Sequence, residues 1–289
     1  MEVVILLKKL IVNADDFGLS SGTNRAIIDL YNEGIVTNTT ILVNHKAFNE
    51  AISLYKKNTG LGLGLHINLL DGHCVANPNK LGSLVNNNGE FLQSPYLLYL
   101  RLISGSISKS EVEYELRMQI EKLLSENVAI LNLDGHQHIH FFPVIYDVVL
   151  SLMNKYGIKR IRFPHDNIIV NEKTSPQRTF VCTALKYYSL TRQKKLIQSN
   201  ILFPKYFCGV RKVGNINKTY LLKFCEKLPD GITELMCHPA YLSDDLRVLK
   251  YHWVNNHNFK EETIALMDAD VKQKLKKMDI QLINYGNLI

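Results

Sequence analysis

The amino-acid sequence predicts an α/β fold, with a (β/α) barrel or a distorted relative of one as its leading form. Short apolar runs alternate with amphipathic helical stretches along most of the chain. The apolar runs are nearly continuous, which is typical of parallel strands that helices cover. A length of 289 residues suits one barrel domain. A doubly wound open sheet is the alternative.

The first strand and the first helix have the clearest local signals. KLIVNA has the pattern of a buried strand, and the stretch that follows it predicts a helix capped by Ser20 or Ser21 and ended by Gly34. Ile27 and Leu30 share the inner face of that helix with Tyr31. Later strands are predicted, in order, at IVTNTTILV, LGLGLHINL, VAILNLDG, IKRIRFP, ITELMCH and DIQLINY.

A second helix is predicted over residues 111–125, where apolar residues recur every three or four positions. Two segments interrupt the alternation: residues 72–108 are rich in Asn, Gly and Ser, and residues 165–230 are basic and aromatic. Neither has a clear linker on both sides, so we expect one domain over residues 1–289 with these two segments as elaborated loops. We also expect them to form the walls of a substrate groove.

Composition narrows the class of protein. The formal net charge of +7 is mild for this length, and no nucleic-acid-binding signature accompanies it, so a solvated basic face is favoured. Five cysteines without a C-x-x-C pair indicate neither a disulfide framework nor a cysteine zinc site. The apolar N-terminus lacks the features of a signal peptide, and no run approaches eighteen apolar residues. A cytoplasmic protein that binds neither nucleic acid nor membrane is expected.

Polar residues stand at the downstream ends of the predicted strands, which converge on one face of a parallel barrel. Each has a structural alternative, because adjacent acids often make a turn or a helix cap and a single histidine is more often a hydrogen-bonded core group. These strand-end residues are Asp15, Asp16, His66, His136, His138, His140, Arg162 and His238.

The cluster HQHIH is the strongest single signal for a cation. Alternate residues of a strand point the same way, so His136, His138 and His140 are expected on one face. Asp134 precedes them and is placed to orient a ligating imidazole. Two carboxylates and at least two imidazoles suit a divalent ion with open positions for water. One acid of the pair Asp15–Asp16 can then bind the ion while its neighbour takes a proton from water.

Five ordered motifs carry a resemblance to a known family. The stretches VNADDFGLS, GIVTNTTILVN, LGLHINL, LDGHQHIHFFP and ELMCHPAY resemble the successive motifs of the YdjC-like carbohydrate deacetylases, which include chitooligosaccharide deacetylase. The resemblance runs from about Lys9 to the C-terminus. It implies a distorted (β/α) barrel related to NodB-type polysaccharide deacetylases. It also implies metal-dependent hydrolysis of an N-acetyl group from an amino sugar or short oligosaccharide.

The resemblance also implies roles for single residues. Asp16, His66 and His136 correspond to the metal ligands, and Asp15 to the general base. His238 corresponds to a general acid, or to a group that stabilises the tetrahedral intermediate. His138, together with Arg162 at another strand end, is expected to bind the substrate.

The cofactor and the partners follow from the same resemblance. Magnesium is the expected ion, although two histidines and one carboxylate also suit zinc or another divalent ion. An N-acetylated sugar is the expected substrate, and a homo-oligomer such as a dimer stays open. A serine nucleophile is disfavoured. Two rival functions remain: a sugar-binding protein without chemistry, and a metal-dependent hydrolase of another bond.

Overall fold

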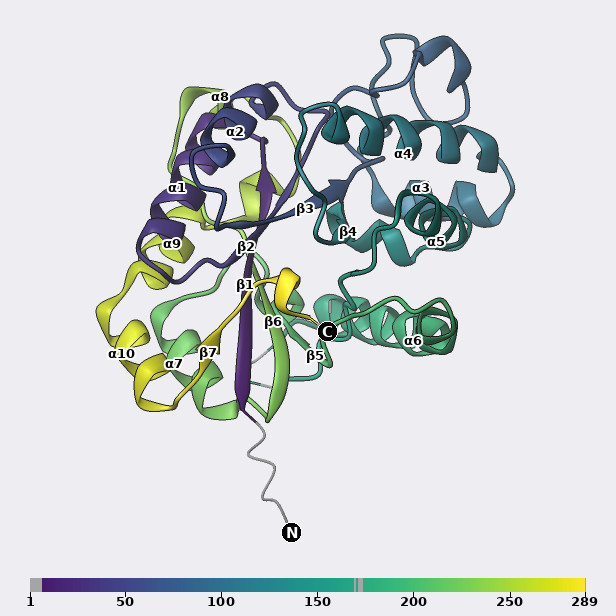
Figure 1. Cartoon of the computed structure of the whole chain (residues 1–289). Coiled ribbons are helices and arrows are strands. Elements are labelled where there is room, and N and C mark those ends of the chain that lie inside the picture. Colours follow the sequence, from purple (N-terminus) through teal and green to yellow (C-terminus); the bar gives the residue numbers. More distant parts are fainter. Residues whose placement is uncertain (1–6, 169, 171–173, 289) are drawn as a thin grey trace.

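A curled sheet of parallel strands forms the centre of the computed structural model, which describes residues 7–168, 170 and 174–288 (Figure 1). Over these residues the sheet has seven strands: β1 Lys8–Phe17, β2 Asn38–Ile41, β3 Gly62–Ile67, β4 Leu133–Gly135, β5 Tyr206–Cys208, β6 Gly231–Cys237 and β7 Gln281–Leu282. Their order is β4-β3-β2-β1-β6-β5, with β7 paired to β1, and every pairing is parallel.

Helices surround this sheet (Figure 1). They are α1 Ser21–Asn32, α2 Phe48–Tyr55, α3 Pro95–Ile103, α4 Lys109–Leu124, α5 Ile145–Tyr156, α6 Pro176–Gln198, α7 Lys218–Lys227, α8 Asp244–Arg247, α9 Phe259–Met267 and α10 Ala269–Lys277. Short 3-10 turns lie at η1 Pro78–Lys80, η2 His136–Phe141, η3 Val210–Lys212, η4 Val254–Asn256 and η5 Tyr285–Asn287.

The segment between α5 and α6 joins the two edges of the sheet. Ile161 bridges to Leu133 of β4, and Asp166 bridges to Phe207 of β5. The predicted strand IKRIRFP is therefore reduced to isolated bridges, but it lies where a barrel strand would close the ring. The sheet is a distorted (β/α) barrel, so the predicted fold class is confirmed.

The strand β1 and the helix α1 form as the sequence predicts. Residues 10–17 of β1 are all buried, because helices cover one face of the strand and the barrel interior covers the other. The side chain of Ser20 accepts a hydrogen bond from the backbone N–H of Thr23, which caps α1. Gly34, with φ 78°, follows the end of the helix.

The end of β1 contains a β-bulge, and both adjacent acids lie in it. Ala14 pairs with Thr39 and Phe17 pairs with Ile41, so two residues of β1 face only Thr40 of β2. Asp16 takes up the irregularity with a left-handed φ of 66°. Simple alternation along an extended strand therefore does not describe this pair.

The three-histidine cluster does not have the predicted geometry. β4 ends at Gly135, and Gln137 and His138 then adopt left-handed backbone angles inside η2. The chain turns within two residues, so the expectation that His136, His138 and His140 share one face of a strand is wrong. Only His136 of these three belongs to the group of metal-ligating geometry described below.

The two interrupting segments contain regular structure that the pattern did not indicate. Residues 72–108 include η1 and α3, and residues 165–230 include the 23-residue α6 as well as β5 and α7. Residues 169 and 171–173 of the second segment, and residues 1–6 of the apolar N-terminus, lie outside the described residues. The single-domain organisation stays a prediction.

Two other expectations concern cysteines and membranes. All five cysteines are unpaired, in agreement with the absence of a disulfide framework. None of the helices in the described part of the chain combines the length and the apolar character that a membrane crossing requires.

We predict that α1 tolerates no side chain where it meets the loop after β6. A Cβ at Gly22 would overlap the backbone oxygen of Tyr241, whose N–H donates to the Gly22 carbonyl. Gly22→Ala is expected to lower the free energy of unfolding by about 1–3 kcal/mol in urea titrations. Gly82→Ala is the matched control, because a Cβ there meets nothing within 4 Å. Equal stability of the two variants would contradict the packing argument.

Candidate metal and catalytic site

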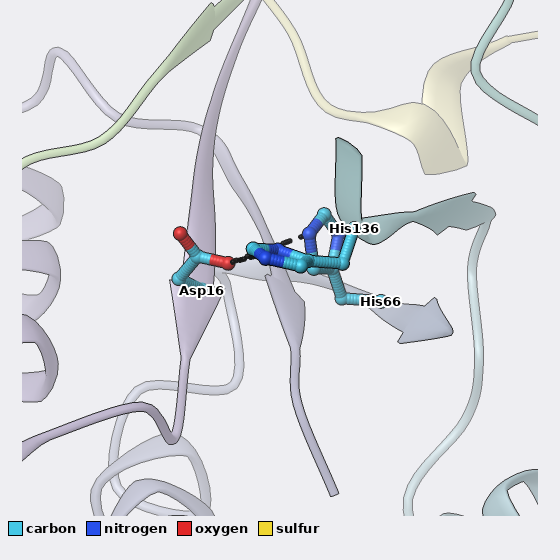
Figure 2. Close-up of side chains that lie close together, drawn as sticks. All are labelled: Asp16, His66 and His136. Atoms are coloured by element: carbon cyan, nitrogen blue, oxygen red, sulfur yellow. Dashed lines mark hydrogen bonds and ion pairs between the residues drawn. The ribbon is translucent and has the colours of Figure 1, made fainter. Parts of the chain in front are cut away.

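One carboxylate and two imidazoles converge at the downstream ends of β1, β3 and β4 (Figure 2). Asp16, His66 and His136 are all buried, and each offers one ligand atom within 4.8 Å of the others. Asp16 Oδ1 lies 3.4 Å from His66 Nε2 and 3.2 Å from His136 Nδ1. The other oxygen, Oδ2, is buried and has no hydrogen-bond partner among the described residues.

His66 is oriented by the carboxylate that the sequence placed beside the histidine cluster. Its Nδ1 lies 2.6 Å from Asp134 Oδ1, and the Thr40 hydroxyl donates to Asp134 Oδ2 at 3.1 Å. This contact turns Nε2 of His66 toward Asp16. Burial lowers the pKa of His66, but the charge of Asp134 outweighs it and the net shift is upward.

His136 is held by a second acid that sequence reasoning missed. Its Nε2 lies 3.2 Å from Asp71 Oδ2, which leaves Nδ1 on the side of Asp16. Burial opposes the imidazolium, but the Asp71 and Asp16 carboxylates outweigh it and raise the pKa of His136 to about 10. Asp71 also contacts His45 Nε2 at 3.2 Å and accepts from Trp253 Nε1 at 2.8 Å. Nothing in the local sequence pattern distinguishes Asp71 from a turn residue.

Asp15 makes its hydrogen bonds with a separate set of partners, although its ligand atom also lies within 4.8 Å of those of His66 and Asp134 in a second group of possible metal-ligand geometry. Arg162 donates to both of its oxygens at 2.6 Å, and Asn13 Nδ2 donates to Oδ1 at 2.7 Å. Burial alone would raise the pKa of Asp15, but the paired guanidinium lowers it far below its usual value. Asp15 is therefore an ionised carboxylate beside the Asp16 group, with acceptor capacity left on Oδ2.

Arg162 is fully buried and lies among three acids. Besides Asp15, it pairs with Asp134 Oδ2 at 2.8 Å and donates to Glu234 Oε1 at 2.9 Å. Tyr285 donates to the other oxygen of Glu234 at 2.6 Å. Burial raises the pKa of Glu234 to about 7, although Arg162 and Tyr285 favour its ionised form. The predicted contact of Arg162 with substrate stays a prediction.

His238 follows β6 and faces the same acid. Its Nε2 lies 3.8 Å from Asp15 Oδ2, and its backbone N–H donates to Glu262 Oε2 at 2.7 Å. Nδ1 is buried and has no hydrogen-bond partner in the described part of the chain. The ring of His257 lies against that of His238, with centroids 5.1 Å apart. His238 is thus placed beside Asp15, at the same oxygen to which Arg162 Nη1 donates.

The remaining two histidines of the cluster pack behind the site. His140 contacts the backbone oxygen of Arg162 through Nε2, and the ring of His138 lies edge-on to Phe207. Burial, followed by the charge of Arg162, holds the pKa of both imidazoles well below the usual range. Both are therefore neutral near pH 7, and the predicted contact of His138 with substrate stays a prediction.

Ser20 does not have the geometry of a serine nucleophile. The stretch Gly18–Gly22 has G-x-S-x-G spacing, but Ser20 is fully buried and caps α1. A nucleophile elbow would instead expose that hydroxyl at the site.

The donor set fits a divalent cation. Two imidazole nitrogens and one carboxylate oxygen leave coordination positions open for water or substrate. His66 Nδ1 is hydrogen-bonded to Asp134, and His136 Nε2 lies at ion-pair distance from Asp71, so each imidazole has a carboxylate beside its other nitrogen, as is usual for a ligating histidine. The unpartnered Asp16 Oδ2 is a further donor that a cation would satisfy.

Comparison with known proteins places this chain in a family. The model of the YdjC-like proteins matches residues 9–277, which is nearly the whole chain. The chain belongs to the YdjC-like family. The resemblance found in the sequence motifs is therefore confirmed.

Two relatives of this YdjC-like chain match over most of both lengths. A carbohydrate deacetylase of Thermoanaerobacter pseudethanolicus is 30% identical, covering 98% of this chain and 100% of its own. A carbohydrate deacetylase of Halalkalibacterium halodurans is 36% identical, covering 83% of this chain and 88% of its own. The names of these relatives agree with the predicted class of enzyme.

A solved structure supports the fold of the YdjC-like chain. A candidate cellobiose-phosphate cleavage protein of Enterococcus faecalis V583 superposes with a TM-score of 0.76, covering 96% of this chain and 98% of the other. The two sequences are 24% identical, so this likeness bears on the fold alone.

Loss of the buried guanidinium is predicted to destabilise the whole barrel. Arg162→Leu leaves three buried carboxylates without their cation, and the free energy of unfolding should fall by about 3–5 kcal/mol. Arg117→Leu is the control, because its pair with Glu121 is partly exposed on one helix and contributes about 0.3–0.5 kcal/mol. Urea unfolding of both variants measures the difference. A similar loss of unfolding free energy in the two variants would show that the buried cluster around Arg162 does not stabilise the barrel.

Proposed function

We propose that this protein is a metal-dependent carbohydrate deacetylase that removes the N-acetyl group from an amino sugar or a short N-acetylated oligosaccharide. The observation that carries the proposal is that two acids adjacent in the sequence have different neighbours. Asp16 lies with His66 and His136, whereas Asp15 lies with Arg162 and His238. A binding protein has no use for an ionised acid held beside a cation site. The names of the relatives support the same reaction.

The proposed ligands are Asp16, His66 and His136. A bound divalent ion supplies a Lewis acid that polarises the acetamide carbonyl and acidifies water. Magnesium follows from the family resemblance, and the nitrogen-rich donor set also suits zinc. Asp134 keeps His66 in the required tautomer and orientation, and Asp71 places a carboxylate beside Nε2 of His136.

Asp15 is the proposed general base. An ionised carboxylate has about four lone-pair sites, and at Asp15 the described contacts use two on Oδ1 and one on Oδ2. The remaining site on Oδ2 can accept the proton of the attacking water. Arg162 prevents rotation of the carboxylate, so it acts as a positioning residue for this step.

His238 is the proposed proton donor to the departing amine. Its Nε2 is the nitrogen that faces Asp15 Oδ2, so the proton accepted by the base has a short path to the imidazole. A protonated His238 can also stabilise negative charge on the tetrahedral intermediate. The predicted groove walls at residues 72–108 and 165–230 would present the sugar to these groups.

The roles of the two acids can be separated by matched substitutions. Asp15→Asn should reduce acetate release by about 10²–10⁴-fold and leave metal content nearly unchanged, because an amide cannot accept the proton from water. Asp16→Asn should lose activity through weaker metal binding, and added metal should partly restore it. The assay is acetate released from a panel of N-acetylated mono- and disaccharides with each divalent ion, together with metal analysis.

The results of that assay decide among the candidate functions. Sugar binding without acetate release by the wild type would point to a non-catalytic binding protein. Loss of the ion from Asp15→Asn but not from Asp16→Asn would reverse the two roles. Unchanged acetate release in both variants would remove the catalytic assignment.

Metal binding is predicted to release protons. Without the ion, His136 holds its proton at neutral pH because its pKa is raised to about 10, and a ligating imidazole must lose that proton. Affinity for the ion should therefore increase as pH increases, by about tenfold per pH unit for each proton released. Calorimetric titration in two buffers of different ionisation enthalpy counts these protons. The double variant His66→Ala, His136→Ala is the control, and binding that is independent of pH would contradict the ligand assignment.

A further inference from the structure

Tyr285 of the turn η5 lies against β1 and β6 and has no part in the chemistry proposed above. The side chain is fully buried and packs in a small apolar cluster with Ile11 of β1. Its hydroxyl donates to Glu234 Oε2 at 2.6 Å. Glu234 pairs with Ile11 in the register of β6 and β1, upstream of Asp15 on the same strand. Tyr285 therefore contacts the sheet upstream of the strand end that carries the proposed base.

The turn η5 is itself firmly attached to the barrel. The backbone N–H of Ile283 donates to a β1 carbonyl at 2.9 Å. Arg160 donates to the backbone oxygens of Gly286 at 3.3 Å and Leu288 at 3.0 Å. The hydroxyl of Tyr285 is thus presented by a turn that is fixed on both sides of it.

A continuous series of hydrogen bonds connects Tyr285 to the proposed base. Glu234 uses both of its oxygens, because Oε2 accepts from Tyr285 and Oε1 accepts from Arg162 Nε at 2.9 Å. The two terminal nitrogens of Arg162 donate to the two oxygens of Asp15 at 2.6 Å. A carboxylate with a donor on each oxygen has its plane fixed, and a guanidinium with its Nε bonded has its tilt fixed. The orientation of Asp15 therefore depends on Glu234 as well as on Arg162.

The charge of Glu234 makes the hydroxyl of Tyr285 important. Burial raises the pKa of Glu234 to about 7, and the like charges of Asp134 and Asp15 act in the same direction. Arg162 and Tyr285 oppose this rise, because both donate to the ionised form. An ionised acceptor makes a shorter and stronger hydrogen bond to a guanidinium than a neutral one. Tyr285 therefore favours the form of Glu234 that binds Arg162 best.

We propose that Tyr285 is a positioning residue for the deacetylation, which orients the carboxylate of Asp15 through Glu234 and Arg162. The inference rests on the proposed function and extends it from the strand ends to a turn that packs on the sheet upstream of them. Tyr285 then affects the rate of the chemical step, and it affects neither the binding of the sugar nor that of the ion.

Kinetics of a single-atom variant test this role. Tyr285→Phe removes the hydroxyl and keeps the ring, so kcat should fall by about tenfold while KM and metal content stay unchanged; misplacement by 1 Å costs about 10²-fold. Tyr156→Phe is the matched control, because that hydroxyl also donates to a carboxylate, Glu121, at 2.6 Å but joins α5 to α4. Its kcat should equal that of the wild type. Glu234→Asp keeps the charge but is too short to reach both partners, so it should show the same loss and tests the link if Tyr285→Phe does not fold.

A double-mutant cycle separates positioning from general damage to the barrel. In Asp15→Asn, the added Tyr285→Phe substitution should leave the residual acetate release unchanged, because the group that it positions is already lost. An equal loss in the wild type and in Asp15→Asn would overturn the proposal. So would a kcat of Tyr285→Phe and Glu234→Asp that equals that of Tyr156→Phe.

Nuclear magnetic resonance gives a readout that is independent of turnover. In protein labelled with ¹³C at the glutamate side-chain carboxyl, the Glu234 signal is the one absent from Glu234→Asp. It should titrate near pH 7 in the wild type and in Tyr156→Phe, and at higher pH in Tyr285→Phe, which lacks a donor to the ionised form. An unchanged titration in Tyr285→Phe would refute the link. If no sugar releases acetate from the wild type, the proposed function fails, and the titration alone decides whether Tyr285 controls Glu234.

Discussion

The buried guanidinium of Arg162 is the interaction on which both the barrel and the site depend. It lies in the segment that closes the ring between β4 and β5, and it pairs with acids from β1, β4 and β6. Removing a charge from water costs several kcal/mol, which only close pairs and complete hydrogen bonding offset. The strands must therefore keep their register around Arg162. The same requirement fixes the carboxylate of Asp15 at the downstream ends of the strands.

This centre contains more negative charge than its own cations can balance. Three buried carboxylates, Asp15, Asp134 and Glu234, pair with one guanidinium, and two more, Asp16 and Asp71, lie against the imidazoles. The protein responds by raising the pKa values of His66 and His136 through their acidic neighbours, and that of Glu234 through burial. A divalent ion at Asp16 would supply positive charge beside these carboxylates. The same buried carboxylates therefore determine the electrostatics of the fold and favour the proposed cation.

The sequence predicted those parts of this arrangement that follow from local patterns. Alternating apolar runs predicted the barrel, and polar residues at strand ends predicted one shared face. The choice of Asp16, His66 and His136 within that face came from the family resemblance. Asp71 and Trp253 were missed, because their contact joins residues 182 positions apart and no local pattern marks either one. The shared face of the three histidines was wrong for a different reason. Left-handed turns at non-glycine residues leave no periodic signal, and the turn at Gln137 and His138 is of that kind.

The bulge in β1 explains why the two acids can be neighbours in sequence and still differ in role. On a regular strand, adjacent side chains point to opposite faces, and one of two adjacent acids would point away from the barrel interior. The extra residue and the left-handed φ of Asp16 bring its carboxylate to His66 and His136 while Asp15 stays on Arg162. Aspartate tolerates this backbone region better than most residues. Asp15, the proposed base, and Asp16, the proposed ligand, are joined by one peptide bond. The backbone, rather than flexible side chains, therefore sets the spacing between these two residues.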